Sequence, residues 1–145
     1  MLHLIQHGAV PFDRTADRAR PGALPGQDFA HVATLSEDGS PHAVVVWVDA
    51  ADGKIRFNSA EHAVKDNHLR RDPRVAVSVH GQDDPYRAVT VLGPAVITTE
   101  GAEEHIDLLT RKYTDRQLYP SEWRAPTEVR VLIEVAPRSI LRYGY

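Results

Sequence analysis

Three apolar runs, separated by two short turn sequences, constrain the fold of this chain more than any other stretch. The runs FAHVATLS, HAVVVWVD and KIRFNS occupy residues 29–36, 42–49 and 54–59. The segments between them, Glu37–Pro41 and Ala51–Gly53, each contain the Asp-Gly pair that favours a tight hairpin turn. We therefore expect three sequential antiparallel strands that form a meander.

The middle run is almost free of polar residues. A β-branched strand without an alternating polar face packs against neighbours on both sides. We therefore expect residues 42–49 to be buried on both faces, either inside a barrel or beneath a partner chain.

A joint between two strands follows, with the sequence NSAEHAVKDNHLRRDPR over residues 58–74. A short helix is expected from Glu61 to Arg71, because an acidic start and a basic end suit the helix dipole. Pro73 prevents the helix from continuing. A helix N-terminus offers free N–H groups and partial positive charge, so this joint is suited to an anionic ligand group.

The remaining sequence continues the β pattern and adds one clearer helix. Residues 74–81 alternate, residues 88–99 form a long strand pattern, and Gly93-Pro94 inside it predicts a sharp bend. An apolar stripe predicts a helix over residues 102–113, followed by a polar loop and a further strand. We expect a mainly β domain over residues 29–145, a closed or split β-barrel of about six to seven antiparallel strands with two capping helices. Residues 1–28 are expected to form an N-terminal arm.

Composition excludes several classes of function. A chain of 145 residues suggests one domain, and its net charge of −3 gives no support for nucleic-acid or membrane partners. The absence of cysteine excludes disulfides and thiolate chemistry and fits a cytoplasmic protein. Neither a signal peptide nor a membrane span is visible. The eight histidines form no short ligand motif, so we expect no metal site.

The order and spacing of these pieces resemble the flavin-reductase-like split β-barrel family. Its best-known member is pyridoxamine 5'-phosphate oxidase, and an actinobacterial branch uses the deazaflavin coenzyme F420 instead of FMN. The resemblance extends from Phe29 to about Val135 and rests on five segments: FAHVATLSEDGSPH, VVVWVD, NSAEHAVKDNHLRRDPRVAVSV, DDPYRAVTVLGPA and HIDLLTRKY.

The resemblance implies a homodimer with the cofactor in a groove at the interface. Lys65 matches the family's phosphate-binding lysine, Asn58 and Ser59 match contacts to the ring or ribityl chain, and the valines match backbone positions facing the ring. The cofactor-binding residues so implied, together with one position where the F420 branch commonly has arginine, are Val44, Val45, Val46, Asn58, Ser59, Lys65 and Asn67.

The sequence departs from the family pattern at positions where relatives carry arginine. Those positions hold Ala63, Val64, Asn67 and Leu92. A phosphate without an arginine fork loses a charge-assisted bond of about 1.5–3 kcal/mol, which corresponds to about tenfold or more in affinity.

The resemblance predicts an oxidoreductase that uses F420 for hydride transfer to a small or medium unsaturated organic substrate. An FMN-dependent oxidase or reductase is one alternative, and a non-catalytic carrier of flavin, deazaflavin, haem or fatty acid is another. No catalytic residue can be named, because in such enzymes the cofactor carries the chemistry. Trp47 suits either the core or a cofactor platform, and Trp123 either a lid or the surface.

Overall fold

The computed structural model describes residues 28–144, so the arm predicted for residues 1–28 lies outside the described part except for Asp28. The described chain contains eight strands, two α-helices and one 3-10 turn. In chain order these are β1 (Phe29–Leu35), β2 (Pro41–Val46), β3 (Val48–Ala51), β4 (Lys54–Ala60), α1 (Val64–Arg71), β5 (Arg74–His80), β6 (Ala88–Thr98), α2 (Ala102–Tyr113), η1 (Ser121–Trp123), β7 (Arg130–Val135) and β8 (Ser139–Tyr143).

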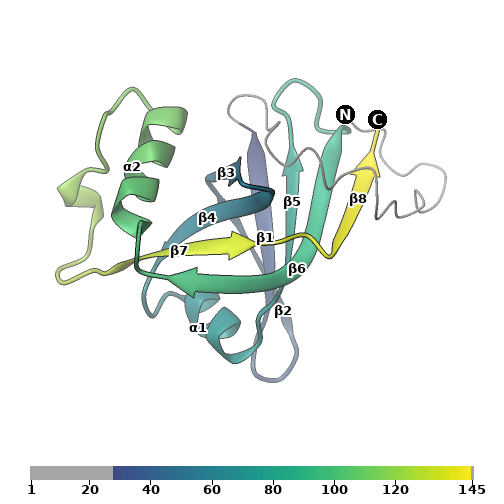
Figure 1. Ribbon diagram of the computed structural model, residues 1–145, viewed down its shortest axis with the longest axis horizontal. Helices are drawn as coiled ribbons and strands as arrows, with labels where there is room; N and C mark the ends of the chain where they lie inside the picture. Colours follow the sequence, from purple (N-terminus) through teal and green to yellow (C-terminus); the bar gives the residue numbers. More distant parts are fainter. Residues whose placement is uncertain (1–27, 145) are drawn as a thin grey trace.

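The strands form one strongly curled antiparallel sheet (Figure 1). Its path is β2-β1-β5-β6-β7-β4-β3, and β8 pairs with β6 beside this path. The path begins at β2 and ends at β3, so the barrel is split. The predicted mainly β split barrel with two helices is confirmed, with eight strands in place of the expected six to seven.

Strand β6 bends at the predicted position, Gly93-Pro94, and the sheet curls there. Its first part pairs with β5, up to Arg74 opposite Pro94, and its last part pairs with β7, from Ala95 opposite Val135. A Cβ on Gly93 would lie 2.3 Å from the carbonyl oxygen of Ala136, so only glycine lets the two backbones approach this closely.

Both predicted hairpin pairings are present, but the single strand expected over residues 42–49 is broken at Trp47, so the three runs do not form a continuous meander. β2 pairs with β1, whereas β3 pairs with β4 at the other end of the sheet. The Trp47 ring stacks on Tyr113 of α2, with centroids 5.5 Å apart and planes at 6°. Lys112 donates a 2.6 Å hydrogen bond to the Val48 carbonyl, and the Tyr113 hydroxyl lies 3.3 Å from the Val48 nitrogen. The end of α2 therefore binds the backbone where the strand changes partners.

The apolar strand β2 is not buried inside the barrel. It is an end strand, and alternate residues on it are exposed within this chain. Val45 keeps 55% of its surface exposed. The expectation of burial inside a barrel is therefore wrong, and cover by a partner chain stays a prediction.

The core consists of inward-facing aliphatic residues and one phenylalanine. The fully buried members include Val32, Val48, Phe57, Val77, Val131 and Ile133. Helix α2 packs on β7 and β4, and α1 packs on β1 and β4. Helix α2 therefore covers the part of the curled sheet where β4 and β7 run side by side (Figure 1).

Helix α1 begins at Val64, three residues later than predicted. His62 adopts a left-handed conformation with φ 69°. The fully buried carboxylate of Asp66 accepts a 2.9 Å hydrogen bond from the His62 N–H, which holds residues before the helix in a turn. The buried aspartate thus fixes how α1 leaves β4.

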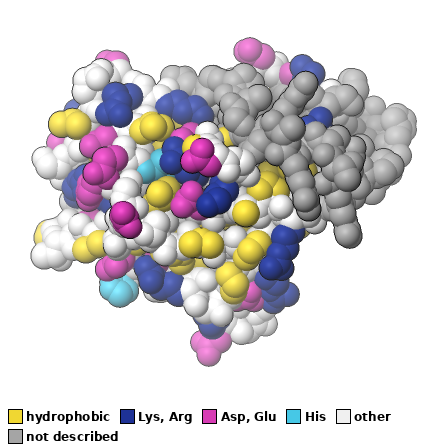
Figure 2. All heavy atoms as spheres, in the orientation of Figure 1, with side chains coloured by type: hydrophobic (Ala, Val, Ile, Leu, Met, Phe, Trp, Pro, Cys, Tyr) yellow, Lys and Arg dark blue, Asp and Glu magenta, His cyan; other side chains and the backbone are white. Residues whose placement is uncertain are grey.

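The described part of the chain has no helix that is long and apolar enough to cross a membrane. On the face drawn in Figure 2, cationic and anionic side chains are intermixed across the described surface. Hydrophobic side chains gather near the middle of this face, where Figure 1 shows β6 and β7.

Candidate functional site

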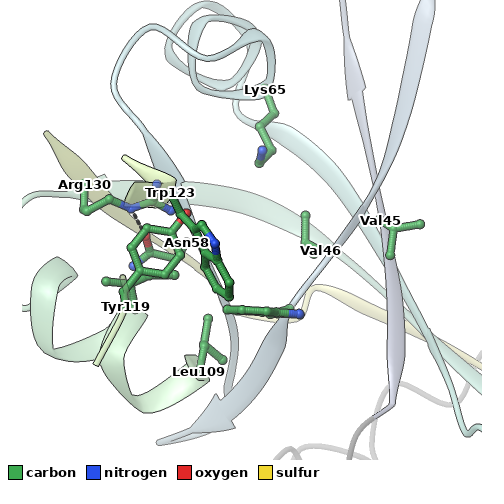
Figure 3. Close-up of a pocket in the computed structure, with 10 residues that line it drawn as sticks. Val45, Val46, Asn58, Lys65, Leu109, Tyr119, Trp123 and Arg130 are labelled. Atoms are coloured by element: carbon green, nitrogen blue, oxygen red, sulfur yellow. Dashed lines mark hydrogen bonds between the residues drawn. The ribbon is translucent and has the colours of Figure 1, made fainter. Parts of the chain in front are cut away.

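A cavity of about 380 Å³ lies between α1, the end of β2 and the loop that follows α2. Figure 3 shows Lys65 reaching into it from α1, with Val46 on one side and Trp123, Tyr119 and Arg130 on the other. Its lining residues are Val45, Val46, Trp47, Asn58, Lys65, Ile106, Leu109, Tyr119, Trp123 and Arg130.

Lys65 occupies the first turn of α1 and is half-buried in the cavity wall. Burial lowers the pKa of its ammonium group, and the nearby positive charge of Arg130 lowers it further. Asp66 acts in the opposite direction but does not reverse the shift. Lys65 is therefore a cation at a site where a bound anion would stabilise it.

Arg130 is the second cation of the cavity and is 9% exposed. It enters from β7, where its backbone pairs with Ala60 at the end of β4. Its Nε donates a 2.8 Å hydrogen bond to Oδ1 of Asn58, and its Nη1 lies 3.2 Å from Glu128. The buried guanidinium is thus held in one orientation by two partners.

An aromatic wall faces these cations. Tyr119 and Trp123 meet edge to face at 5.7 Å, and the guanidinium of Arg130 lies 5.1 Å from the centre of the Tyr119 ring. Arg124 binds Glu103 through two hydrogen bonds of 3.0 and 2.7 Å, which fastens this loop to α2. These contacts therefore hold the Tyr119 and Trp123 rings in place at the edge of the cavity.

The cavity combines the two kinds of surface that a flavin-type cofactor needs. Its volume lies within the range of about 300–1,000 Å³ that is typical of small-molecule sites. Trp47, Trp123 and the aliphatic residues suit a planar ring, and Lys65 with Arg130 suits an anionic group. The residues present fit a ligand that joins an aromatic ring system to a phosphate.

The sequence matches a protein-family model over most of its length. The model described as pyridoxamine 5'-phosphate oxidase matches residues 18–141. The chain belongs to the pyridoxamine 5'-phosphate oxidase family. Members of this family bind flavin-type cofactors, FMN or F420. No functionally curated protein matches the chain in sequence.

Solved structures with the same fold include one protein named for F420 and another named for FMN binding. An F420 reductase is 26% identical, with a TM-score of 0.67 over 90% of this chain and 98% of its own. A putative pyridoxamine 5'-phosphate oxidase from Listeria innocua is 21% identical, with a TM-score of 0.61 over 81% of this chain and 89% of its own. A pyridoxamine 5'-phosphate oxidase-related, FMN-binding protein from Nostoc punctiforme is 12% identical, with a TM-score of 0.56 over 77% of this chain and 71% of its own.

The structure brings together four of the seven residues that resemblance to the pyridoxamine 5'-phosphate oxidase family marked for cofactor binding. Val45, Val46, Asn58 and Lys65 line the cavity. The other three are not among its lining residues. Val44 is a half-buried neighbour on β2, Ser59 is buried on β4, and the exposed Asn67 donates a 3.2 Å hydrogen bond to the His62 carbonyl.

The arginines at the end of α1 do not replace the missing family arginines. Arg70 binds Asp66 at 3.0 Å, and Arg74 binds Asp72 at 2.7 Å. Arg71 donates a 2.6 Å hydrogen bond to the Leu35 carbonyl. The guanidinium in the cavity comes instead from β7.

Sequence reasoning missed Arg130 and Tyr119 as cavity residues. The only signal for Arg130 was an arginine that precedes the largely apolar run VLIEV. Its position beside Asn58 depends on the register between β4 and β7, which no local pattern specifies. Tyr119 lies in a loop with no periodic pattern, and the braces that orient it are tertiary contacts.

Proposed function

We propose that this protein is an oxidoreductase that binds F420 and transfers hydride to a small or medium unsaturated organic substrate. The observation that carries the proposal is that two cations, Lys65 and Arg130, line one cavity walled by aromatic and aliphatic residues. The F420 reductase that is 26% identical over 90% of this chain supports the choice of F420.

The cofactor supplies the hydride chemistry when it is bound. The protein binds and orients the cofactor and excludes water from the site. Lys65 and Arg130 would hold the phosphate, since both are cations in the cavity wall. Trp47 is fixed by its stack on Tyr113 and would offer a flat surface to the ring. Ile106 and Leu109 of α2 would keep water from the same space.

We also propose that the working protein is a cytoplasmic homodimer. The end strand β2 exposes alternate residues, and Val45 both lines the cavity and remains 55% exposed. A second copy placed over β2 would bury this apolar surface and close the cavity on that side.

FMN is the second candidate cofactor. The family model and the FMN-binding relative support it, since FMN also joins a planar ring to a phosphate. A carrier without turnover is the rival from another class. The carrier is favoured by one feature of the sequence: Ala63, Val64 and Leu92 stand where relatives have arginine.

Turnover with chemically reduced F420 and a panel of unsaturated substrates tests the proposal. Oxidation of the cofactor that requires both protein and substrate, and that saturates with substrate, is the expected result. Tight cofactor binding without turnover across the panel would establish the carrier instead. Turnover with reduced FMN alone would assign the cofactor to FMN.

A further inference from the structure

A chain of buried hydrogen bonds leads from the cavity wall into the interior. Arg130 Nε lies 2.8 Å from Asn58 Oδ1, and Asn58 Nδ2 lies 3.2 Å from His105 Nδ1. His105 Nε2 lies 2.7 Å from Asp49 Oδ1. Asn58, His105 and Arg130 are 8%, 3% and 9% exposed, so solvent replaces none of these bonds easily.

Donor chemistry fixes the direction of every bond in this chain. Arg130 Nε can only donate, so the Asn58 atom that faces it must be the carbonyl oxygen. The Asn58 amide nitrogen then faces both the Ala102 carbonyl, at 2.9 Å, and His105 Nδ1. His105 Nδ1 must accept, so its proton resides on Nε2 and is donated to Asp49.

At the end of this series of hydrogen bonds that lies away from the cavity, Arg56 holds Asp49 in place. Arg56 Nε donates a 3.1 Å hydrogen bond to Asp49, and a second guanidinium nitrogen also contacts the carboxylate. Burial alone would raise the pKa of Asp49, but the hydrogen bonds from His105 and Arg56 more than offset it, and the pKa is lowered. Asp49 is thus an ionised acceptor that orients the imidazole.

We infer that His105 is a positioning residue for anion binding, which acts through Asn58 on Arg130. By accepting from Nδ2, which also donates to the Ala102 carbonyl, the imidazole helps to fix the amide so that Oδ1 faces Arg130 and orients the guanidinium in the cavity wall. Without that acceptor, one of the two bonds that fix the amide is lost. Only the 2.9 Å bond from Nδ2 to the Ala102 carbonyl then opposes a rotation that would present the NH₂ group to the guanidinium, a contact between two donors. The inference rests on the proposed function, because the anion is the phosphate of the cofactor.

Two substitutions of His105 separate its two bonds. His105→Asn places a carboxamide oxygen near the position of Nδ1 and keeps the acceptor for Asn58, but it does not reach Asp49. His105→Gln extends an NH₂ group toward the position of Nε2 and keeps the donor to Asp49, but it removes the acceptor. A merely structural role would make both variants alike in ligand preference.

The readout is the ratio of affinities for two ligands that differ by phosphate. The pair is FMN with riboflavin, or F420 with its phosphate-free deazariboflavin part, whichever the wild-type protein binds. We expect His105→Asn to keep the preference for phosphate within about twofold and His105→Gln to lose at least tenfold of it. Equal preference in both variants would overturn the inference.

A second readout needs no cofactor and so separates this inference from the proposed function. In nitrogen-15 NMR spectra, the Arg130 Nε–H should exchange slowly with solvent in wild type and His105→Asn, and rapidly in His105→Gln. A protected Arg130 Nε–H in His105→Gln would overturn the inference. If His105→Gln does not fold, the wild-type protein still decides, because a His105 proton found on Nδ1 rather than Nε2 contradicts it.

Discussion

Nε of Arg130 donates a 2.8 Å hydrogen bond to Oδ1 of Asn58, and this bond joins β7 to β4 across the wall of the cavity. The two residues are 72 positions apart in the sequence. The bond orients a guanidinium in the wall of the cavity that the Lys65 ammonium group enters from α1. Two cations from separate elements thus line one largely apolar cavity.

Arg130→Lys should weaken binding of phosphate-bearing cofactors by about tenfold or more, because lysine keeps the charge but cannot form the guanidinium fork. Riboflavin, which lacks the phosphate, should lose less affinity than FMN. Isothermal titration measures both. Arg138→Lys, at an exposed position outside the cavity lining, is the matched control. Equal losses for riboflavin and FMN would remove Arg130 from the phosphate site.

Lys65→Met should lower the affinity for phosphate-bearing ligands without lowering stability at neutral pH. Burial and the charge of Arg130 lower the pKa of Lys65 in the folded protein below its ordinary value of 10.5. Between the lowered pKa and 10.5 the unfolded chain binds more protons, so this group makes the free energy of unfolding rise with pH in that window. Below the window, the ionised lysine costs the folded protein stability.

Urea unfolding at a series of pH values up to about 10.5 checks the sign of this contribution. Wild type should gain stability relative to Lys65→Met as the pH rises through the window. Lys54→Met, at a lysine whose side chain is 44% exposed, should leave ligand affinity unchanged. Wild type and Lys65→Met with parallel pH profiles would show that Lys65 is not desolvated.

Gly93→Ala should destabilise the fold by about 1–3 kcal/mol, because the added Cβ would lie 2.3 Å from the Ala136 carbonyl oxygen and the backbone must shift. Gly81→Ala is the matched control, since its Cβ would meet only the Asp28 carboxylate at an ordinary 3.7 Å. Chemical denaturation of both variants measures the difference. A Gly93→Ala variant as stable as Gly81→Ala would mean that the bend in β6 does not depend on this close approach.

Val45→Asp should convert a dimer into a monomer and weaken cofactor binding, because it places a charge on the exposed face of β2 that lines the cavity. Analytical ultracentrifugation gives the oligomeric state of wild type and variant. Val96→Asp, on β6 and 60% exposed, is the comparison at a similarly exposed valine. A wild-type protein that is monomeric at all concentrations would contradict the proposed dimer.

Local patterns predicted those features that depend on neighbours in sequence. The apolar stripe from Ala102 to Tyr113 gave α2 its observed bounds, and Gly93-Pro94 marked the bend in β6. Pro73 lies where α1 has ended and just before β5 begins. In each case a steric or periodic rule acts within a few residues, so sequence alone suffices.

The features that sequence could not give depend on contacts between distant segments. The run from His42 to Asp49 reads as one strand, and its break at Trp47 arises because Tyr113 and Lys112 bind the chain there. The position of Arg130 in the cavity depends on sheet register and on a partner 72 residues away. Neither contact leaves a local signal in the sequence.

The most direct test of the account is an equilibrium titration of the purified protein with F420, with FMN in parallel. Trp47 and Trp123 are the two tryptophans of the chain and both line the cavity, so quenching of their fluorescence reports occupancy. We predict saturable quenching by F420 with a dissociation constant at the micromolar level or tighter, weakened at least tenfold in Arg130→Lys and in Lys65→Met. Tight quenching by FMN alone would contradict the assignment of F420, and the absence of saturable quenching by either cofactor would contradict the cavity as the cofactor site.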